Sequence, residues 1–381
     1  MMSGFSRGDR LAAMAAAISA LAACTSACTS AGAPPAPEET PCADGLERLD
    51  DRCVEPARRY EPDDPVDGDN VVSYSDPPGL DLPDPPKAGF RLVMPPVDLA
   101  AGEEQEFCVS WPFPAGQSRD LVYAAVLYTT GGLHHSNVFS SPVDAELGAN
   151  PYPGCHPGGG DPFAQVGEAI PDVLFANSTQ VVGGESLIFP AGMGYRVHHE
   201  REVVANVHVL NTSGAPQRVE VVYDFYTMPE EALDEELAPF VLDNRAFSIP
   251  PMQTETIEAD CPVWDGNIVS VMPHTHQFSE RFAVETMSHE GVSTLIYEDT
   301  GYDQETDIVV FDEAPSLAEA TRLKFSCTFR NTKSSPLVYG LGDQEMCILF
   351  GYMYPIDQQF AGMQSNLDDG CQTIRIGIFQ P

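Results

Sequence analysis

The chain has 381 residues, with 19 basic and 57 acidic side chains and a formal net charge of −38. This length is sufficient for two ordinary domains. Nucleic acids and anionic lipid surfaces bind basic patches, so the charge argues against both as partners. Such acidity is typical of a highly soluble protein rather than of one that binds a specific ligand.

The N-terminus has the features of an export signal. Arg7 and Arg10 precede the apolar run 11–23, which is too short to cross a bilayer stably. The tetrapeptide LAAC, which ends at Cys24, matches a bacterial lipobox; a second candidate ends at Cys28, and ordinary signal cleavage is the alternative. We expect residues 1–23 to be a signal peptide and Cys24 to carry a lipid that anchors the protein to the cell envelope, at the outer membrane or cell surface.

Residues 24–87 are rich in proline and acidic side chains, which predicts an extended tether. Ten cysteines in an exported chain predict disulfides. Cys42 and Cys53 are placed to close a small loop within the tether. If Cys24 is lipidated, nine cysteines remain and Cys28 is the expected unpaired one.

From residue 88 the pattern changes to short runs of alternating apolar and polar residues, separated by proline and glycine. The clearest runs are 107–111, 121–128, 219–225, 282–284, 323–329 and 374–378. Many short strands with turn signals predict antiparallel β-sandwiches. The acidic segment 229–237, with room for one or two helical turns, is the best boundary and gives β-rich domains at 88–228 and 237–381.

The histidines carry the functional signal. They occur as the pairs His134-His135 and His198-His199, as His208, as His274 and His276, and as the isolated His156 and His289. Side chains alternate along a strand, so the His-x-His at 274–276 places two imidazoles on one face. Adjacent histidines reach one metal only at a strand end or a bulge, and Gly131-Gly132 before His134 supplies such an irregularity.

Other candidate ligands leave alternatives open. His208 lies in the valine-rich run 203–210, where a satisfied core histidine is the alternative to a ligand. The charged surroundings of His198-His199 are typical of an exposed turn, yet this pair competes with His208. Met346 either fills a core gap or offers a soft thioether that favours Cu(I). Two imidazoles and a thioether therefore predict copper rather than zinc.

The complete set of motifs resembles a known family. In chain order it comprises His134-His135, His208 followed by Asn211, Ile249-Pro250-Pro251, Cys261, His274-Thr275-His276, Cys327-Thr328-Phe329 and Glu345-Met346-Cys347. This order is similar to that of the copper type II, ascorbate-dependent monooxygenases, over about residues 88–381. Each motif is short, but together they are specific.

The resemblance implies an all-β fold of two tandem jelly-roll-like antiparallel β-sandwich domains that present two copper ions to a shared cleft. It assigns His134, His135 and His208 to an electron-transfer copper. It assigns His274, His276 and Met346 to an oxygen-activating copper. The implied reaction hydroxylates a C–H bond with O2 and ascorbate or another one-electron donor. The family's disulfides imply Cys327–Cys347 and Cys261–Cys371, which leaves Cys108–Cys155 by elimination.

The chain departs from the family where peptide-hydroxylating members hold a substrate carboxylate. Met272 replaces an arginine, and Ile348 and Phe350 replace an asparagine and a tyrosine. These changes predict a small apolar or aromatic substrate. Two other functions fit the sequence: a non-catalytic copper-binding lipoprotein of the same fold, and a surface module whose histidines bind zinc or no metal.

Overall fold

The computed structural model describes residues 47–49, 52–54, 71–72, 79–111, 121–141, 152–153, 172–177, 183–197, 202–263, 265–301, 308–340, 344–355, 363–366 and 370–373. Several residues with predicted roles lie outside this part, namely Cys24, Cys28, Cys42, Cys155, His156, His198 and His199. Cys53 and Cys371 are described for their backbone alone. The described residues contain no helix that could span a bilayer.

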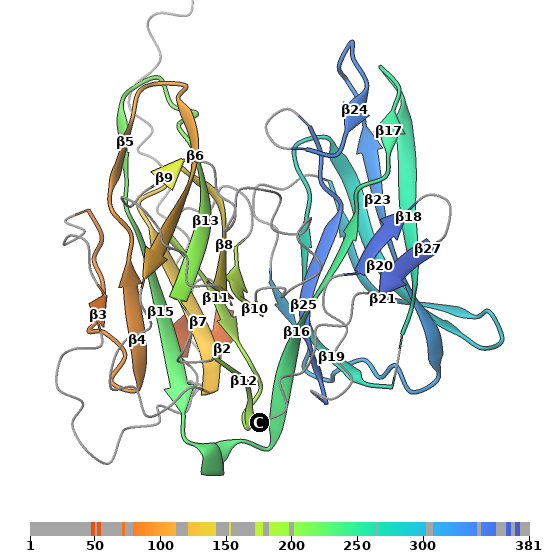
Figure 1. Ribbon diagram of the computed structural model, residues 1–381, viewed down its shortest axis with the longest axis horizontal. Helices are drawn as coiled ribbons and strands as arrows, with labels where there is room; N and C mark the ends of the chain where they lie inside the picture. Colours follow the sequence, from red (N-terminus) through yellow and green to blue (C-terminus); the bar gives the residue numbers. More distant parts are fainter. Residues whose placement is uncertain are drawn as a thin grey trace, which may run out of the picture.

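The chain forms two β-sandwich lobes side by side, joined by a short linker (Figure 1). The first lobe contains β4 (Gly89–Val93), β5 (Val97–Leu99), β6 (Glu104–Trp111), β7 (Leu121–Thr129), β8 (Leu133–Ser141), β9 (Tyr152–Pro153), β10 (Asp172–Ala176), β11 (Gly183–Ile188), β12 (Met193–Arg196), β13 (Glu202–Leu210), β14 (Gln217–Val219) and β15 (Val221–Met228). The linker holds the 3-10 turn η1 (Glu230–Ala232) within the predicted boundary segment. The all-β prediction is confirmed.

The second lobe contains β16 (Glu235–Asn244), β17 (Ser248–Ile249), β18 (Thr254–Pro262), β19 (Asn267–His274), β20 (Ser279–Ser288), β21 (Ser293–Thr300), β22 (Val309–Val310), β23 (Ala320–Arg330), β24 (Leu337–Val338), β25 (Ile348–Tyr354), β26 (Met363–Asn366) and β27 (Gly370–Thr373). Its two main layers have the strand orders β18-β23-β20-β21 and β22-β19-β25-β16. The predicted run 374–378 lies outside the described residues.

The first lobe packs the sheet β10-β8-β13-β6-β9 against the sheet containing β12-β7-β15-β4. Phe107, Val109 and Trp111 share one face of β6, as predicted, and are buried in the core between the sheets. The Trp111 indole donates to the Val93 carbonyl over 3.1 Å and meets the Tyr223 ring edge-on. These contacts tie the histidine-bearing sheet to the opposite layer.

A disulfide joins the two layers of the second lobe. Cys327 on β23 is bonded to Cys347, the residue before β25, with a Cα–Cα distance of 6.0 Å. This pairing is confirmed, and it fixes the segment that carries Met346. Cys108 and Cys261 are also disulfide-bonded. Their predicted partners, Cys155 and Cys371, have no described side chains.

Each lobe closes one corner with the same asparagine arrangement. Asn211 follows β13 and donates through its side chain to the carbonyls of Leu99, Ala100 and Ala215. Asn331 follows β23 and donates to the carbonyls of Ile249, Pro250 and Ser335. In both, the amide oxygen accepts from the backbone N–H two residues later. The lobes are therefore alike in local construction as well as in layer architecture.

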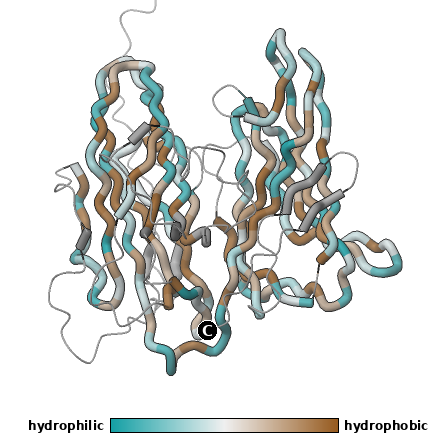
Figure 2. The backbone as a smooth tube through the Cα atoms, viewed as in Figure 1, coloured by the Kyte–Doolittle hydropathy of each residue, from teal (hydrophilic) through white to brown (hydrophobic). Residues whose placement is uncertain are grey.

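The two lobes are packed against each other rather than loosely tethered. β12 pairs in parallel with β16, through Met193 and Glu235 to Tyr195 and Leu237. One apolar core continues from the first lobe to the facing side of β19 and β25. Figure 2 shows apolar residues inside each lobe and along the strands where the lobes meet. The buried interface holds the strands that carry the histidines in fixed relative positions.

Part of the predicted tether belongs to the first lobe. β1 (Glu47–Leu49) and β2 (Arg52–Val54) pair as a small hairpin at the predicted Cys42–Cys53 loop. β3 (Val71–Val72) extends the first lobe's sheet by pairing with β4. The Gly79 N–H donates to Glu220 over 2.6 Å, and Pro86 is buried. The lobe thus begins before residue 88. A short strand pairing attaches the segment to the sheet, and amino-acid composition does not predict such a pairing.

Candidate metal centre

A β-bulge lets the paired histidines of β8 face the same region. His208 on β13 pairs with His135, and Val209 pairs with Leu133, so His134 is the extra residue of the bulge. Gly131 and Gly132 precede it with positive φ values of 93° and 83°, a conformation that glycine adopts without steric cost. The irregularity that the paired histidines require is present where the glycines predict it.

Hydrogen bonds orient His208 and His135. His208 Nε2 lies 2.6 Å from a carboxylate oxygen of Glu104 on the neighbouring strand β6. A carboxylate can only accept, so Nε2 carries the proton and Nδ1 keeps its lone pair. That Nδ1 lies 3.2 Å from Nε2 of His135. The other ring nitrogen of His135, Nδ1, is buried and has no hydrogen-bond partner among the described residues.

His274 is the last residue of β19, and His276 follows two residues beyond its end. His276 Nδ1 donates to the backbone carbonyl of Gln344 over 2.9 Å. This bond places the proton on Nδ1 and leaves the lone pair on Nε2. His276 Nε2 is buried and unpartnered within the described part of the chain. A nitrogen with this arrangement is suited to bind a metal.

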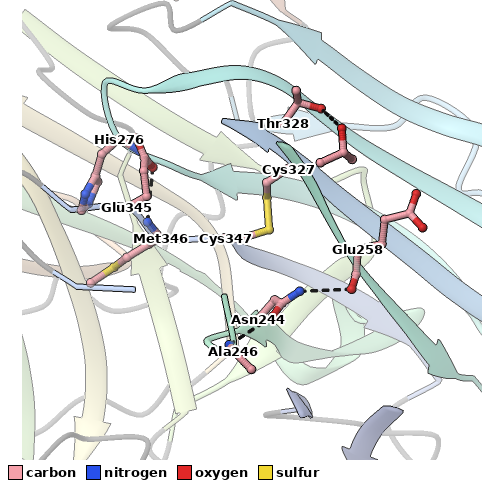
Figure 3. The surroundings of a disulfide bond; sticks show 10 residues. Asn244, Ala246, Glu258, His276, Cys327, Thr328, Glu345, Met346 and Cys347 are labelled. Atoms are coloured by element: carbon pink, nitrogen blue, oxygen red, sulfur yellow. Dashed lines mark hydrogen bonds between the residues drawn. A yellow bond between two sulfur atoms is a disulfide. The ribbon is translucent and has the colours of Figure 1, made fainter. Parts of the chain in front are cut away.

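The carboxylate of Glu345 connects the His-x-His segment to Met346. It accepts from the backbone N–H groups of His276 and Phe278, each over 2.7 Å, and from that of Met346 over 3.3 Å. Figure 3 shows Glu345 between His276 and Met346, whose side chains lie on the same side of the segment, away from the Cys327–Cys347 disulfide. Glu345 is fully buried, and burial raises its pKa to about 8 although the three N–H donors lower it.

Five histidines from both lobes converge. The centroid of the His135 ring lies 5.0 Å from that of His208 in its own lobe and 4.9 Å from that of His274 in the other. The ring centroids of His134 and His276 lie 6.1 Å apart, again across the boundary between the two lobes. Two triads have ligand atoms within 4.8 Å of one another: His134, His135 and His208, and His135, His274 and His276. His135 belongs to both.

Burial favours the neutral form of four of these imidazoles. Burial and, to a smaller extent, the neighbouring His208 and His276 lower the pKa of His134 to about 3. Desolvation also holds the pKa values of His135 and His274 well below the usual range, and lowers that of His276. Neutral imidazoles have the free lone pairs that metal binding requires. A bound metal would also satisfy the two unpartnered nitrogens, whose burial otherwise costs free energy, so the residues present fit a metal centre.

An apolar wall adjoins the histidines. On β19, Met272 and His274 share a face, and on β25 Ile348, Phe350 and Tyr352 share the corresponding face, all of them toward the first lobe. The Phe350 ring lies 6.5 Å from that of His274. A small pocket opens between the lobes here, and its lining includes Ala176, Leu187, Met272, Ile308, Phe350 and Tyr352. Met272 and Phe350 line this pocket, while Ile348 is buried on the same face without lining it.

The structure therefore brings His134, His135, His208, His274 and His276 together and leaves His289 exposed on a distant hairpin. The two candidate triads share His135. The sequence did not identify Glu104 as a residue of the site, because its contact with His208 depends on the pairing of β6 with β13. Glu345 lies in a motif that the sequence singles out, but its three N–H partners become visible only in the fold.

Residues 241–371 match the family model described as copper type II ascorbate-dependent monooxygenase, C-terminal domain. No curated protein gives a significant match to the chain. Two solved structures are remotely similar. PBSX exported protein XepA is 8% identical, with a TM-score of 0.20 over 69% of this chain and 86% of that one. PBCV-1 VP54, fitted into a reconstruction of the virophage Sputnik, is 7% identical, with a TM-score of 0.22 over 69% and 92%. Neither likeness bears on fold or function.

Proposed function

We propose that the chain is a copper-dependent monooxygenase, because residues 241–371 match the family model described as copper type II ascorbate-dependent monooxygenase, C-terminal domain. It hydroxylates a C–H bond of a small apolar substrate. The overall reaction consumes R–H, O2, two electrons and two protons and yields R–OH and water. Ascorbate or another one-electron donor supplies the electrons in two one-electron oxidations. The observation that carries the proposal is the convergence of five buried histidines from both lobes.

The ligand types suit two copper ions. His134, His135 and His208 hold one ion, and His274, His276 and Met346 hold the other. Bound copper supplies one-electron redox chemistry and activation of dioxygen. Imidazoles serve either oxidation state, and the thioether of Met346 favours Cu(I) at the second ion.

The remaining residues position these ligands and shape the site. Glu104 fixes the tautomer of His208, and the Gln344 carbonyl fixes that of His276. Glu345 keeps the backbones of His276 and Met346 in register. The packed interface between the lobes excludes water from the imidazoles, which limits the loss of reactive species to solvent.

The apolar side chains near His274, among them Phe350 with its ring 6.5 Å from that of His274, favour an apolar substrate. Met272 and Phe350 carry no charge, and apolar surface that a substrate buries against them would contribute binding free energy of about 25 cal/mol per Å². We expect Met272→Arg to raise the KM for an apolar substrate, because the guanidinium would be buried without a partner carboxylate. A substrate that carries a carboxylate would bind the introduced guanidinium and should show a higher kcat/KM. The ratio of the kcat/KM values for the two substrates therefore measures this specificity.

Ascorbate-dependent oxygen consumption by the copper-loaded protein, with a panel of small apolar compounds, tests the proposal. Products from 18O2 should contain one labelled oxygen atom. Met346→Ala should abolish hydroxylation. Met252→Ala is the matched control, because Met252 is 74% exposed and outside the histidine cluster. Bound copper without oxygen uptake or product would favour the alternative, a non-catalytic copper-binding lipoprotein.

We also propose that the protein is exported and held at the cell envelope by a lipid on Cys24, with no nucleic-acid partner. The support is the sequence of residues 1–24 and the net charge of −38. Metabolic labelling with a fatty acid should mark the native chain and not a Cys24→Ser variant. Equal labelling of both would contradict the anchor.

A further inference from the structure

A polar network lies in the apolar core of the first lobe, beside the histidines of β8. Its members Ser136, Asn177 and Tyr223 are buried, with exposures of 0%, 3% and 1%. The Tyr223 hydroxyl lies 2.8 Å from Ser136 Oγ, which in turn lies 2.6 Å from Asn177 Oδ1. The Ser136 backbone N–H donates to the same Oδ1, and the Asn177 N–H donates to the Ser136 carbonyl over 3.1 Å. Ser136 is thus held through both its side chain and its backbone.

The direction of each hydrogen bond in this network is fixed. An amide oxygen can only accept, so the Ser136 hydroxyl donates to Asn177 and its lone pair accepts from Tyr223. Burial raises the pKa of Tyr223, so its hydroxyl keeps the proton that it donates. The hydroxyl, the N–H and the carbonyl of Ser136 are therefore all engaged by two residues from elsewhere in the fold.

Ser136 lies on the core face of β8, opposite to the face of His135. In the pairing of β8 with β13, Ser136 is opposite Val207 and His135 is opposite His208. Paired residues of neighbouring strands point to the same side of a sheet, and successive residues of one strand point to opposite sides. Val207 is part of the apolar core, so Ser136 points to the opposite layer, where Tyr223 lies. His135 consequently points the other way, to the histidine cluster.

Asn177 also connects β8 to the strand that contacts the second lobe. It follows β10, in which the Leu174 carbonyl accepts the hydroxyls of Tyr195 and Tyr352, over 2.7 and 2.9 Å. Tyr195 belongs to the first lobe and Tyr352 to the second, and their rings stack with centroids 5.1 Å apart. The network therefore joins the histidine strand both to the opposite layer of its own lobe and to the interface between the lobes.

The bulge in β8 gives such an anchor a purpose. His134, the extra residue of the bulge, and His135 have the same side chain, so a shift of the bulge by one position would exchange their places. Apolar contacts have no direction and discriminate weakly between two such registers. A buried polar network loses its partners when the strand moves, and each buried polar group that is left unsatisfied costs free energy. The network therefore favours one register over the other.

We propose that Ser136, Asn177 and Tyr223 are positioning residues that fix the register of β8, so that His134 stays the extra residue of the bulge and His135 stays paired with His208. The inference rests on the proposed function, because it names what positions the histidine ligands of the first lobe. None of the three positioning residues is itself one of those ligands. The register is a property of the metal-free chain, so it can be measured apart from copper binding.

Nuclear magnetic resonance of the metal-free full chain with labelled histidines tests the register. Ser136→Ala should give a second set of signals for His134 and His135, because both registers become populated. Tyr223→Phe keeps the ring and removes one donor, and should give the same change to a smaller extent. Ser136→Thr, which keeps the hydroxyl, should retain a single set. A single, unshifted set of signals in both Ser136→Ala and Tyr223→Phe would overturn the inference; if thermal unfolding shows that Ser136→Ala does not fold, Tyr223→Phe decides.

Copper affinity provides a second measurement, with Val138→Ala as the matched control. Val138 is fully buried on the same strand, and its truncation removes packing without removing a hydrogen bond of the network. In a His276→Asn background, Ser136→Ala should weaken copper binding by about tenfold or more. Val138→Ala should leave the affinity unchanged although it also lowers thermal stability. Equal losses of affinity in the two variants would contradict a positioning role. An unaltered chain that binds no copper would refute the proposed function, while the histidine signals would still decide the register.

Discussion

The Nδ1–H group of His276 donates to the backbone carbonyl of Gln344 over 2.9 Å, which leaves Nε2 as the nitrogen with the free lone pair. The next residue along, Glu345, accepts the backbone N–H of the same histidine. The ring and the backbone of His276 are therefore held by two consecutive residues of a distant segment. The disulfide at Cys347 anchors that segment in turn.

Glu345→Gln should weaken the copper held by the second lobe. Its two oxygens accept three N–H groups, and an amide must present its own N–H₂ to at least one of these donors. We expect a loss of about 10- to 100-fold in copper affinity, as for other residues that orient metal ligands. Unfolding should be easier by about 1–3 kcal/mol. Competition with a chromophoric Cu(I) chelator and chemical denaturation measure the two effects.

The matched control is Glu258→Gln, since Glu258 is half exposed and pairs with Lys324 over 2.6 Å on the outer sheet of the same lobe. Surface pairs of this kind contribute little. Equal copper affinities in the two variants would show that Glu345 does not position the ligands.

Glu104→Ala should weaken the copper of the first lobe. The carboxylate fixes the proton of His208 on Nε2, and without it the ring is free to adopt the other tautomer or to rotate. We expect about a tenfold or greater loss of affinity. Glu104→Gln, which keeps an acceptor oxygen, should restore part of it. Measurement in a His276→Asn background isolates the first triad. Glu106→Ala, two residues along β6, is the control, and an equal effect there would argue against a specific role for Glu104.

The asparagine corners should be important for stability in each lobe. Asn331→Ala removes the donor to three carbonyls and the acceptor for the Lys333 N–H. The expected loss is about 2–4 kcal/mol of unfolding free energy. Asn211→Ala should cost a similar amount in the first lobe. The neighbouring Thr212→Ala and Thr332→Ala are exposed controls, and denaturant titrations in which they match the asparagine variants would refute the prediction.

The metal-free protein should lose stability as the pH falls below 6.5. Above this pH the His134 imidazole is neutral in both states and contributes no pH dependence. Below it, the unfolded chain takes up a proton that the folded chain, with a pKa of about 3, does not. Unfolding is then favoured by about 2 kcal/mol at pH 5 from this residue alone. Denaturation at pH 7 and pH 5 should therefore show a smaller pH effect in His134→Asn; an unchanged pH effect would mean that His134 is protonated in the fold.

Much of the candidate site is visible in the sequence because it depends on local patterns. The His-x-His spacing predicts two imidazoles that point to one side; His274 ends β19, His276 lies two residues beyond it, and the ligand atoms of both lie within 4.8 Å of one another. Gly131-Gly132 predicts the irregularity that the His134-His135 pair needs, and the bulge is present there. The alternation of Phe107, Val109 and Trp111 predicts a strand with a buried face, because the side-chain period of a strand does not depend on its neighbours.

Contacts between distant segments could not be read in this way. Glu104 is one acidic residue among 57 until β6 pairs with β13 and brings it to His208. The pairing of β3 with β4 could not be predicted either, because the amino-acid composition around β3 is typical of an extended tether. In each case the register between strands far apart in the chain determines which residues come into contact. Amino-acid composition does not predict that register.

The sequence by itself predicted the β-rich character and the histidine motifs, because these follow from residue type and local spacing. The copper ligand set, and the apolar Met272, Ile348 and Phe350 in place of polar residues, are what the resemblance to the family implies. The tertiary structure alone decided that His135 lies between the two lobes. That position results from the parallel pairing of β12 with β16 and from the two tyrosines that share the Leu174 carbonyl. Ligand identity is a property of single residues, whereas the distance between ligands of different lobes is set by how their surfaces pack.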